Sequence, residues 1–345
     1  MGIALQTVTN ELTHVFLLSV GAFLLAMFLT PIYTFFAYRY RFWKRQRSES
    51  TDGKKLKVFA KFQAAKLRRN IPTMAGVIGV ISIFVVTIFF NLDRAQTWLP
   101  LAALVGGGIV GLIDDIINLR GLGGGAAGLR SPVKFALITL IGVVLGWFFF
   151  AKLGVASFHV PFVGEVNIGW LIVPLFAFAV VATGNAVNIS DGMDGLAGGL
   201  LGISFGAFGV IALLQQHVIL AGFCFTVVGV LLSYLWFNIY PARFFMGDVG
   251  SFAYGASLGV VAMLTDSLLL LPVIGLLFVI EAGSSLTQIV SKKLFKRKIF
   301  LSAPIHHHLE AIGWPETKVT MRFWVIGCVM AFIGVMLALA GGHIA

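Results

Sequence analysis

The chain has 345 residues, of which 59% are hydrophobic and only 11% are charged. A soluble domain carries about 25% charged residues, so this composition excludes an ordinary soluble protein and indicates a polytopic membrane protein. The formal net charge of +11 favours anionic partners, such as a lipid bilayer or phosphorylated substrates, and argues against a nucleic acid. Cys224 and Cys328 both lie in apolar runs, which argues against a disulfide framework.

Apolar runs of spanning or near-spanning length recur along the whole chain, since a spanning helix needs about 20 apolar residues. They predict an all-α fold, a bundle of about ten transmembrane helices that forms one integral membrane domain, residues 1–345. The run at 267–290 contains Pro272 and Glu281, so it is expected either to bend or to extend beyond the bilayer. The predicted spans are 15–37, 72–90, 97–113, 132–151, 168–187, 196–213, 218–237, 252–265, 267–290 and 319–341.

The basic residues are distributed unequally between the two sides of this bundle. Ten spans place both termini on one side, and cytoplasmic loops carry the excess of Lys and Arg. All Lys and Arg residues except Arg94 and Lys152 fall at or beside four alternate loops, namely 38–70, 114–134, 238–251 and 291–322. The pattern predicts that both termini lie outside and that these four loops face the cytoplasm.

Five carboxylates fall on the predicted cytoplasmic side: Asp114, Asp115, Asp191, Asp194 and Asp248. The whole chain has only 14 acidic residues, and an apolar protein rarely keeps carboxylates at membrane edges without a use for them. Asp114 and Asp115 are adjacent, so together they require a cation or strong hydrogen-bond donors. Oxygen ligands suit Mg²⁺, whereas a structural zinc site would call for thiolates. The pattern predicts a divalent-metal and phosphate site built from several loops.

Polar residues recur at every third position of the central segment: Asn185, Asn188, Asp191 and Asp194. The three steps from the first of these residues to the fourth drift by about 180° around a regular α-helix, so one continuous helix cannot direct all four to one site. Gly192 and Gly195 would allow the backbone to break and approach a ligand. A polar turn between two spans is the alternative interpretation.

Three further features carry candidate chemistry. Asp248 lies between glycines in the segment 238–251, where a helix cap is the alternative to a metal ligand. The histidines at 306–308 point in different directions, so they form no tridentate metal face, but they could donate hydrogen bonds or carry charge near a phosphate. A surface loop is the alternative there. Glu281 lies within an apolar run and is either functional or a hydrogen-bonded packing residue.

Taken together, these segments resemble the phospho-N-acetylmuramoyl-pentapeptide transferases, a family within the polyprenyl-phosphate N-acetylhexosamine-1-phosphate transferase superfamily. The aspartate motifs are shared across the superfamily, whereas APIHHHLE followed by GWPE is specific to the family. The matching stretches, in family order, are IPTMAG (71–76), GLIDD (111–115), NAVNISDGMDGLAGG (185–199), WFNIYPARFFMGDVGS (236–251), FVIEAGSSLTQ (278–288) and APIHHHLEAIGWPE (303–316).

The resemblance implies a Mg²⁺-dependent transferase of peptidoglycan synthesis in the bacterial inner membrane, with its active site on the cytoplasmic side. Such an enzyme moves phospho-MurNAc-pentapeptide from UDP-MurNAc-pentapeptide to undecaprenyl phosphate and yields lipid I and UMP. Members of the family often form dimers, so a homodimer is an expectation of the same kind. One alternative is a GlcNAc-1-phosphate transferase acting on polyprenyl phosphate. The other is a transporter, although a transporter would line a midplane pathway with polar residues.

The resemblance also implies residue roles. The implied catalytic residues are Asp114, Asp115, Asp248 and His306, and the implied metal ligands are Asp248 and Asp191. The implied substrate-binding residues are Lys134, Asn185, Asn188, Asp191, Asp194, Asn238, Phe244, His307 and His308. Asp194 and Asn238 match the uridine side, where Phe244 or Phe245 could stack on the base.

The chain departs from the family pattern beside the paired aspartates. The family places a lysine three residues after the second aspartate, whereas this chain has Asn118. A nearby basic residue, Arg120 or Lys134, would then have to serve the lipid phosphate. The departure concerns the contacts with the acceptor and leaves the expected reaction class unchanged.

Overall fold

The computed structural model describes residues 2–43, 70–121 and 128–342. Most of the predicted basic loop, from Lys44 to Arg69, lies outside the described residues. The helices are α1 (Gly2–Arg39), α3 (Gly76–Phe90), α4 (Trp98–Arg120), α5 (Ser131–Leu153), α6 (Ile172–Ser190), α7 (Leu196–Leu214), α8 (Val218–Asn238), α9 (Gly247–Leu264), α10 (Leu271–Ile274), α11 (Leu276–Phe295), α12 (Ile305–Ala311) and α13 (Glu316–Ala340). Short 3-10 turns η1 (Gly169–Leu171) and η2 (Leu268–Leu270) precede α6 and α10.

The predicted all-α polytopic membrane fold is confirmed. Within the described ranges, eight helices are long and apolar enough to cross a membrane, and the bent unit of η2, α10 and α11 brings the number to nine if it is one span. The remaining predicted span is occupied by α3, an apolar helix of only 15 residues. Each of the ten predicted runs therefore corresponds to helical structure.

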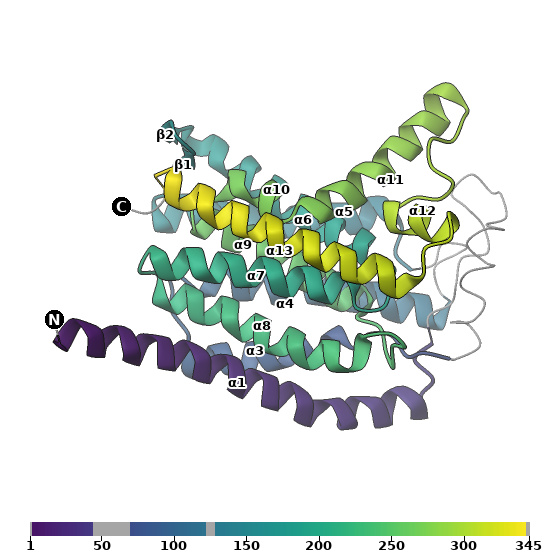
Figure 1. Ribbon diagram of the computed structural model, residues 1–345, viewed down its shortest axis with the longest axis horizontal. Coiled ribbons are helices and arrows are strands. Elements are labelled where there is room, and N and C mark those ends of the chain that lie inside the picture. The colour runs from purple at the N-terminus through teal and green to yellow at the C-terminus, as the bar shows by residue number, and fades with distance from the viewer. Residues whose placement is uncertain (1, 44–69, 122–127, 343–345) are drawn as a thin grey trace.

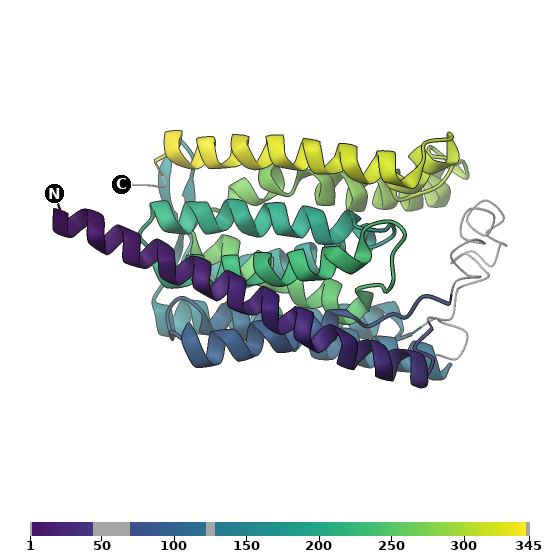
Figure 2. The ribbon, with the colours of Figure 1, turned by 60° about the horizontal axis from the view of Figure 1, so that its bottom comes forward.

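Both ends of the bundle are defined by the long helices (Figures 1 and 2). The start of α1 and the end of α13 lie at the same end of the molecule, as an even number of crossings requires. Helix α12 and the outer part of α11 lie at the opposite end. We refer to the end with α12 as the loop end and to the other as the terminal end.

Helix α9 is the centre of the bundle, although it is the least apolar of the spanning helices. Every residue from Gly247 to Met263 is buried, and the helix packs against α3, α4 and α6. Gly, Ala and Ser dominate its sequence because neighbouring helices, and not lipid, surround it. This composition explains why the predicted apolar run, 252–265, is shorter than the helix.

Small side chains let α9 approach α4 very closely. A Cβ atom at Gly111 of α4 would lie 2.1 Å from the backbone oxygen of Asp248, a distance that excludes any side chain. Asp114 and Asp115 follow Gly111 by about one helical turn, so the contact brings both beside the start of α9. The backbone contact therefore positions three of the predicted site residues.

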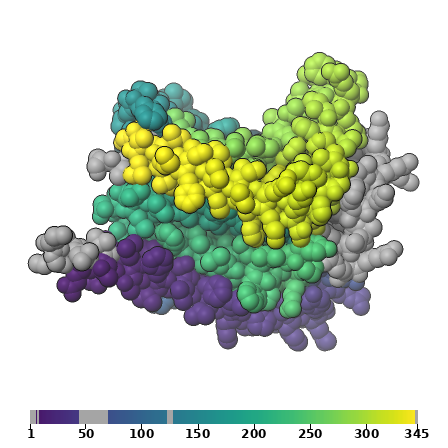
Figure 3. All heavy atoms as spheres, in the orientation of Figure 1, coloured from purple at the N-terminus to yellow at the C-terminus, as the bar shows by residue number. Residues whose placement is uncertain are grey.

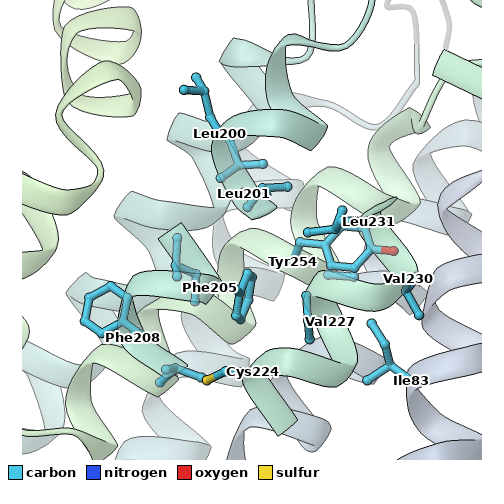
Figure 4. Packing of buried hydrophobic residues seen from close by; sticks show 14 of the residues in the cluster. Ile83, Leu200, Leu201, Phe205, Phe208, Cys224, Val227, Val230, Leu231 and Tyr254 are labelled. Carbon is cyan, nitrogen blue, oxygen red and sulfur yellow. The ribbon is translucent and has the colours of Figure 1, made fainter. Parts of the chain in front are cut away.

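The apolar core lies mainly between α7, α8 and α9 (Figure 4). Phe205 and Phe208 of α7 face Cys224 and Val227 of α8, and the ring of Tyr254 from α9 completes the layer. Large apolar side chains elsewhere face outward, most densely on α1, α5 and α13. Examples are Phe16, Phe28, Trp147, Val325 and Phe332, each at least half exposed. These faces suit contact with lipid.

The run at 267–290 bends, which is one of the two alternatives that the sequence predicted. The segments Leu268–Ile274 and Leu276–Phe295 meet at an angle of 81°. Helix α11 consequently slopes away from the bundle and projects at the loop end, and the space-filling surface has a notch between this projection and the terminal end (Figure 3). Pro272 lies in the short helix α10, ahead of the break at Gly275.

One element was not predicted. Strands β1 (Ser157–Val160) and β2 (Gly164–Asn167) form an antiparallel hairpin between α5 and α6 at the terminal end. The backbone N–H of His159 donates to Asp266 Oδ1 at 2.9 Å, and its ring lies 2.8 Å from the backbone oxygen of Gly341. These contacts attach the hairpin to the α9–η2 turn and to the end of α13.

Candidate active site

Three aspartates meet at the loop end of α4 and α9. One carboxylate oxygen from each of Asp114, Asp115 and Asp248 lies within 4.8 Å of the others, and all three residues are buried. Their exposed fractions are 1%, 0% and 6%. The structure therefore brings these three residues together from segments that are distant in the sequence, as predicted.

Lys134 of α5 supplies a positive charge to this cluster. Its Nζ lies 2.7 Å from Asp248 Oδ2 and 3.0 Å from Asp114 Oδ1, so one ammonium group joins two carboxylates from different helices. Arg120, the other basic residue that could replace the missing family lysine, is exposed at the end of α4. The structure thus places Lys134, and not Arg120, at the paired aspartates.

Backbone amides complete the surroundings of two of the carboxylates. The N–H of Leu129 donates to Asp114 Oδ1 at 2.8 Å, and the N–H of Val249 donates to Asp115 Oδ2 at 3.1 Å. Both donors favour the ionised carboxylates. Val249 belongs to the first turn of α9, where the partial positive charge of a helix N-terminus also attracts anions.

The central segment does not act as one helical face. Helix α6 ends at Ser190, and Asp191 to Gly195 form the turn before α7, as the predicted backbone break requires. The Nδ2 of Asn188 donates to Ser251 Oγ at 2.9 Å, and Ser251 Oγ donates to the backbone oxygen of Asp248 at 3.4 Å. The Nδ2 of Asn185 donates to Val181 O of its own helix.

Asp194 and Asn238 hold the loop that precedes α9. Asp194 Oδ2 accepts a hydrogen bond from the N–H of Ala242 at 3.0 Å. Asn238 accepts from the N–H of Gly195 at 2.9 Å and donates to the backbone oxygen of Phe244 at 2.8 Å. Both side chains therefore fix the shape of this loop against the α6–α7 turn.

The two phenylalanines of the loop differ in exposure. Phe244 is 1% exposed and packs against the rings of Tyr33, Tyr234 and Phe237. Phe245 is half-buried. The ring of Phe244 is thus part of the core in this structure, and its predicted contact with a nucleobase stays a prediction.

The three histidines lie at the start of α12 in three different settings. His306 is buried, and its Nδ1 lies 2.7 Å from Oε2 of Glu281 on α11. His307 Nδ1 lies 3.2 Å from Oε2 of Glu310, and His308 Nδ1 accepts a hydrogen bond from the N–H of Leu301. The three imidazoles thus contact three different partners.

The donor set at the aspartate cluster suits a hard divalent cation. Three carboxylates bring three negative charges when ionised, and Lys134 forms salt bridges with two of them, Asp114 and Asp248. Carboxylate oxygens are the ligands that Mg²⁺ takes. Asp191, which the sequence also predicted as a metal ligand, is not in this group of three, so that role stays a prediction.

Some residues of the site escaped sequence reasoning. Glu316 of α13 accepts a hydrogen bond from the N–H of Asp194 at 2.7 Å, and Thr320 and Trp324 donate to the backbone oxygens of Asp194 and Gly195. Glu316 closes the GWPE stretch, which is the signal that could have identified it. Leu129 acts through its backbone, so no side-chain pattern could reveal it.

The fold and the site define a polytopic membrane protein with a buried carboxylate and lysine cluster at one end of its helices. Residues 97–266 match the model of glycosyl transferase family 4. Known relatives extend this match to almost the whole chain. The phospho-N-acetylmuramoyl-pentapeptide-transferase of Chloroflexus aggregans is 38% identical over 356 residues, which cover 99% of this chain and 94% of the relative.

Two further relatives carry the same name. The protein of Geobacillus thermodenitrificans is 35% identical over 91% of this chain and 94% of its own length. The protein of Oceanobacillus iheyensis is 35% identical over 94% of this chain and 98% of its own length. The chain belongs to the phospho-N-acetylmuramoyl-pentapeptide-transferase family, which confirms the family resemblance seen in its motifs.

Proposed function

We propose that the protein transfers phospho-MurNAc-pentapeptide from UDP-MurNAc-pentapeptide to undecaprenyl phosphate, giving lipid I and UMP in peptidoglycan synthesis. In the simplest form, a phosphate oxygen of the lipid attacks the phosphorus next to the sugar. The bond from that phosphorus to the oxygen bridging to the uridine-side phosphate breaks, and UMP leaves. Membership of the family supports the assignment of donor and acceptor.

The observation that carries this proposal is the buried cluster of Asp114, Asp115 and Asp248 with Lys134. Phosphoryl transfer needs positioning and charge neutralisation more than covalent chemistry from the protein. A cluster of carboxylates and one lysine, at the end of a bundle whose outer faces suit lipid, can bring a soluble polyanion and a lipid phosphate together. The loop end would then face the cytoplasm of a bacterial inner membrane.

Mg²⁺ is the cation that fits this donor set. Asp248, Asp114 and Asp115 would hold it, and it would supply charge neutralisation at the transferring phosphoryl group. Lys134 holds Asp114 and Asp248 at fixed positions and offsets one of the three charges. Because Asp114 and Asp115 belong to the same cluster as Asp248, we assign them to the metal as well as to the lipid phosphate.

The nucleotide side is formed by the loop before α9. Asp194 and Asn238 act there by holding the loop backbone. Phe244 supports the loop from the core, so the half-buried Phe245 is the better ring for stacking on uracil. His306 lies against Gly192 of the α6–α7 turn, and we assign His306, His307 and His308 to the phosphates or the sugar of the donor. A homodimer remains an expectation from the family resemblance.

The test is release of UMP by the purified protein with both substrates and Mg²⁺. We expect UMP and lipid I in equal amounts, and removal of Mg²⁺ by EDTA should stop the reaction. Asp248→Asn should lower kcat by at least about 10²-fold, because it removes one charge from the cluster. Absence of UMP from a folded wild-type protein would refute the proposal.

Asp93 offers a matched control for the Asp248 variant. Its Oδ1 accepts hydrogen bonds from the N–H groups of Ala95 and Gln96 in the α3–α4 turn, and an amide oxygen can accept the same bonds. Asp93→Asn should therefore keep wild-type turnover.

The identity of the donor is tested by competition. With labelled UDP-MurNAc-pentapeptide as the donor, excess unlabelled UDP-MurNAc-pentapeptide should suppress formation of the labelled lipid product, and UDP-GlcNAc should not. The opposite ranking would indicate the GlcNAc-1-phosphate transferase.

A further inference from the structure

A carboxylate and an imidazole form a buried pair between α11 and α12. Glu281 Oε2 and His306 Nδ1 lie 2.7 Å apart, and both side chains are 0% exposed. A buried charge in a membrane helix is costly unless it is paired, so this contact requires a reason. The family model match ends at residue 266, so this pair lies beyond it.

The backbone around the pair is held in place from α11. The N–H of Ile305 donates to Ser284 Oγ at 2.9 Å, and Ser284 Oγ donates to the backbone oxygen of Glu281 at 2.9 Å. Glu281 and Ser284 are three residues apart and thus share one helix face. One turn of α11 therefore contacts both the backbone and the first imidazole of the histidine run.

The opposite side of the imidazole meets the central motif. A Cβ atom at Gly192 would lie 2.4 Å from His306 Nε2, so the ring edge rests against the bare backbone of the α6–α7 turn. Gly192 follows Asp191 directly. The imidazole therefore lies between the carboxylate of Glu281 on one edge and the central turn on the other.

We propose that Glu281 is a positioning residue for the transfer reaction: it accepts the Nδ1–H of His306 and so directs Nε2 toward the Asp191–Gly192 turn. The hydrogen bond at one ring nitrogen determines which tautomer is present and where the other nitrogen is directed. The inference rests on the proposed function, because there the imidazole serves the phosphates or the sugar of the donor. Glu281 itself touches no substrate.

A packing role alone does not explain the choice of a carboxylate. Among the described residues, Glu281 Oε1 has no hydrogen-bond partner although it is buried. Such an oxygen is destabilising, and an apolar side chain of similar volume would pack without that cost. The oxygen that does have a partner faces the imidazole, so the carboxylate contributes through His306.

The first test is independent of turnover. In protein with ¹⁵N-labelled histidine, the His306 signals are identified by their loss in His306→Ala. We expect a protonated Nδ1 in the wild type and a shift of the tautomer equilibrium toward Nε2–H in Glu281→Leu. A bare Nδ1 in the wild type would overturn the proposal, whether or not the protein releases UMP.

The second test separates positioning from packing by kinetics. Glu281→Leu should lower kcat for UMP release roughly 10²-fold, with little change in KM for either substrate. Glu281→Gln keeps an accepting oxygen and should recover most of this loss. In the His306→Ala background Glu281→Leu should have no further effect, because the two residues act as one unit. Additive losses, or a loss confined to KM, would contradict the assignment.

Gln288 provides the control on the same helix. Its side chain forms hydrogen bonds with the backbone of Ile299 and Phe300. Gln288→Leu should lower the melting temperature of the protein while leaving the His306 ¹⁵N signals and the tautomer unchanged. If it shifts the tautomer as Glu281→Leu does, the effect is a general disturbance of α11 and the proposal fails. If the wild type shows the expected tautomer but releases no UMP, the proposed function fails and Glu281 loses its role in the reaction.

Discussion

Lys134 is the side chain on which the aspartate cluster depends electrostatically. It contacts Asp114 and Asp248 directly, and 18% of its side chain is exposed. Breaking a buried ion pair by removing one partner costs about 3–5 kcal/mol, because the remaining charge is left uncompensated. The same cluster can accept a divalent cation, which offers a second way to neutralise it. Lysine and metal should therefore compensate for one another in stability.

This compensation gives a prediction for Lys134→Met. In EDTA the variant should melt well below the wild type, since Asp114 and Asp248 would lose their lysine partner. Added Mg²⁺ should raise the melting temperature of the variant more than that of the wild type. Scanning fluorimetry with and without Mg²⁺ measures both effects. If Mg²⁺ raised the melting temperature of both proteins equally, the idea that Lys134 and the metal neutralise the same carboxylates would be contradicted.

Lys152 is the matched control for this experiment. It is an exposed residue in the last turn of the same helix, α5, at the terminal end of the bundle. Lys152→Met removes the same charge from the chain but leaves the aspartate cluster intact. Its melting temperature should follow the wild type in EDTA and in Mg²⁺.

At the scale of elements, the contact between α4 and α9 determines the geometry of the site. Gly111 lies against the backbone of Asp248, so the two helices cannot separate without moving a carboxylate. Gly202 of α7 differs from it in one respect that matters: a Cβ atom there would meet nothing within 4 Å. The helix contact requires glycine at position 111, whereas nothing requires glycine at position 202.

We expect Gly111→Ala to lower both the melting temperature and kcat, because the added methyl group must push α9 away from α4. The loss of stability should be about 1–3 kcal/mol, as for other overpacked sites. Gly202→Ala should be neutral or stabilising, since alanine favours a helix by about 1 kcal/mol over glycine. Thermal unfolding and UMP release measure the two quantities. If Gly111→Ala changed neither the melting temperature nor kcat, α4 and α9 would have space for a methyl group at position 111, contrary to the structure.

The hairpin β1–β2 introduces a pH dependence at the terminal end. Burial raises the pKa of Asp266 from 3.8 to about 7, although the N–H of His159 donates to its carboxylate. Glu165 lies beside it and has a lowered pKa, chiefly because of a hydrogen bond from Ser157. A proton held by Asp266 allows the two carboxyl groups to share a hydrogen bond.

The sign of the resulting effect on stability follows from linkage. A carboxyl whose pKa is higher in the folded state binds more protons there, so its contribution is full below pH 3.8 and declines as the pH rises to about 7. The melting temperature should fall by a few degrees between pH 5 and pH 8. Asp266→Asn should show a smaller fall, and asparagine suits the positive φ of 51° at this position. An equal fall in both proteins would assign the pH dependence to a group other than Asp266.

For the whole molecule, the sequence predicted the class of fold because lipid imposes a simple rule. A chain that crosses a bilayer must bury its backbone polar groups in helices, and ten apolar runs revealed ten helical segments. The distribution of Lys and Arg correctly placed the two termini at one end. The hairpin was missed because its eight strand residues are too few to stand out between long apolar runs.

The site was predictable in its residue types and less so in its contacts. Asp114, Asp115 and Asp248 carry chemistry that a membrane protein keeps only for a purpose, so their scarcity revealed them. Side chains that act on the backbone could not be recognised in this way. Asp194 and Asn238 were expected to face a ligand, and in the structure both form hydrogen bonds that hold a loop. Only the three-dimensional arrangement shows Glu281 beside His306, 25 residues away in the chain.

The composition of α9 has a consequence for the synthesis of the protein. A helix rich in Gly and Ser, with Asp248 in its first turn, gains little from contact with lipid alone. Its partners α3, α4 and α6 all precede it in the chain and leave the ribosome earlier. A protein-lined slot can thus already exist when α9 is made, and α9 enters by displacing lipid from that slot. The order of the helices along the chain is in this sense also an order of assembly, in which Asp248 is made after Asp114, Asp115 and Lys134 and completes their cluster.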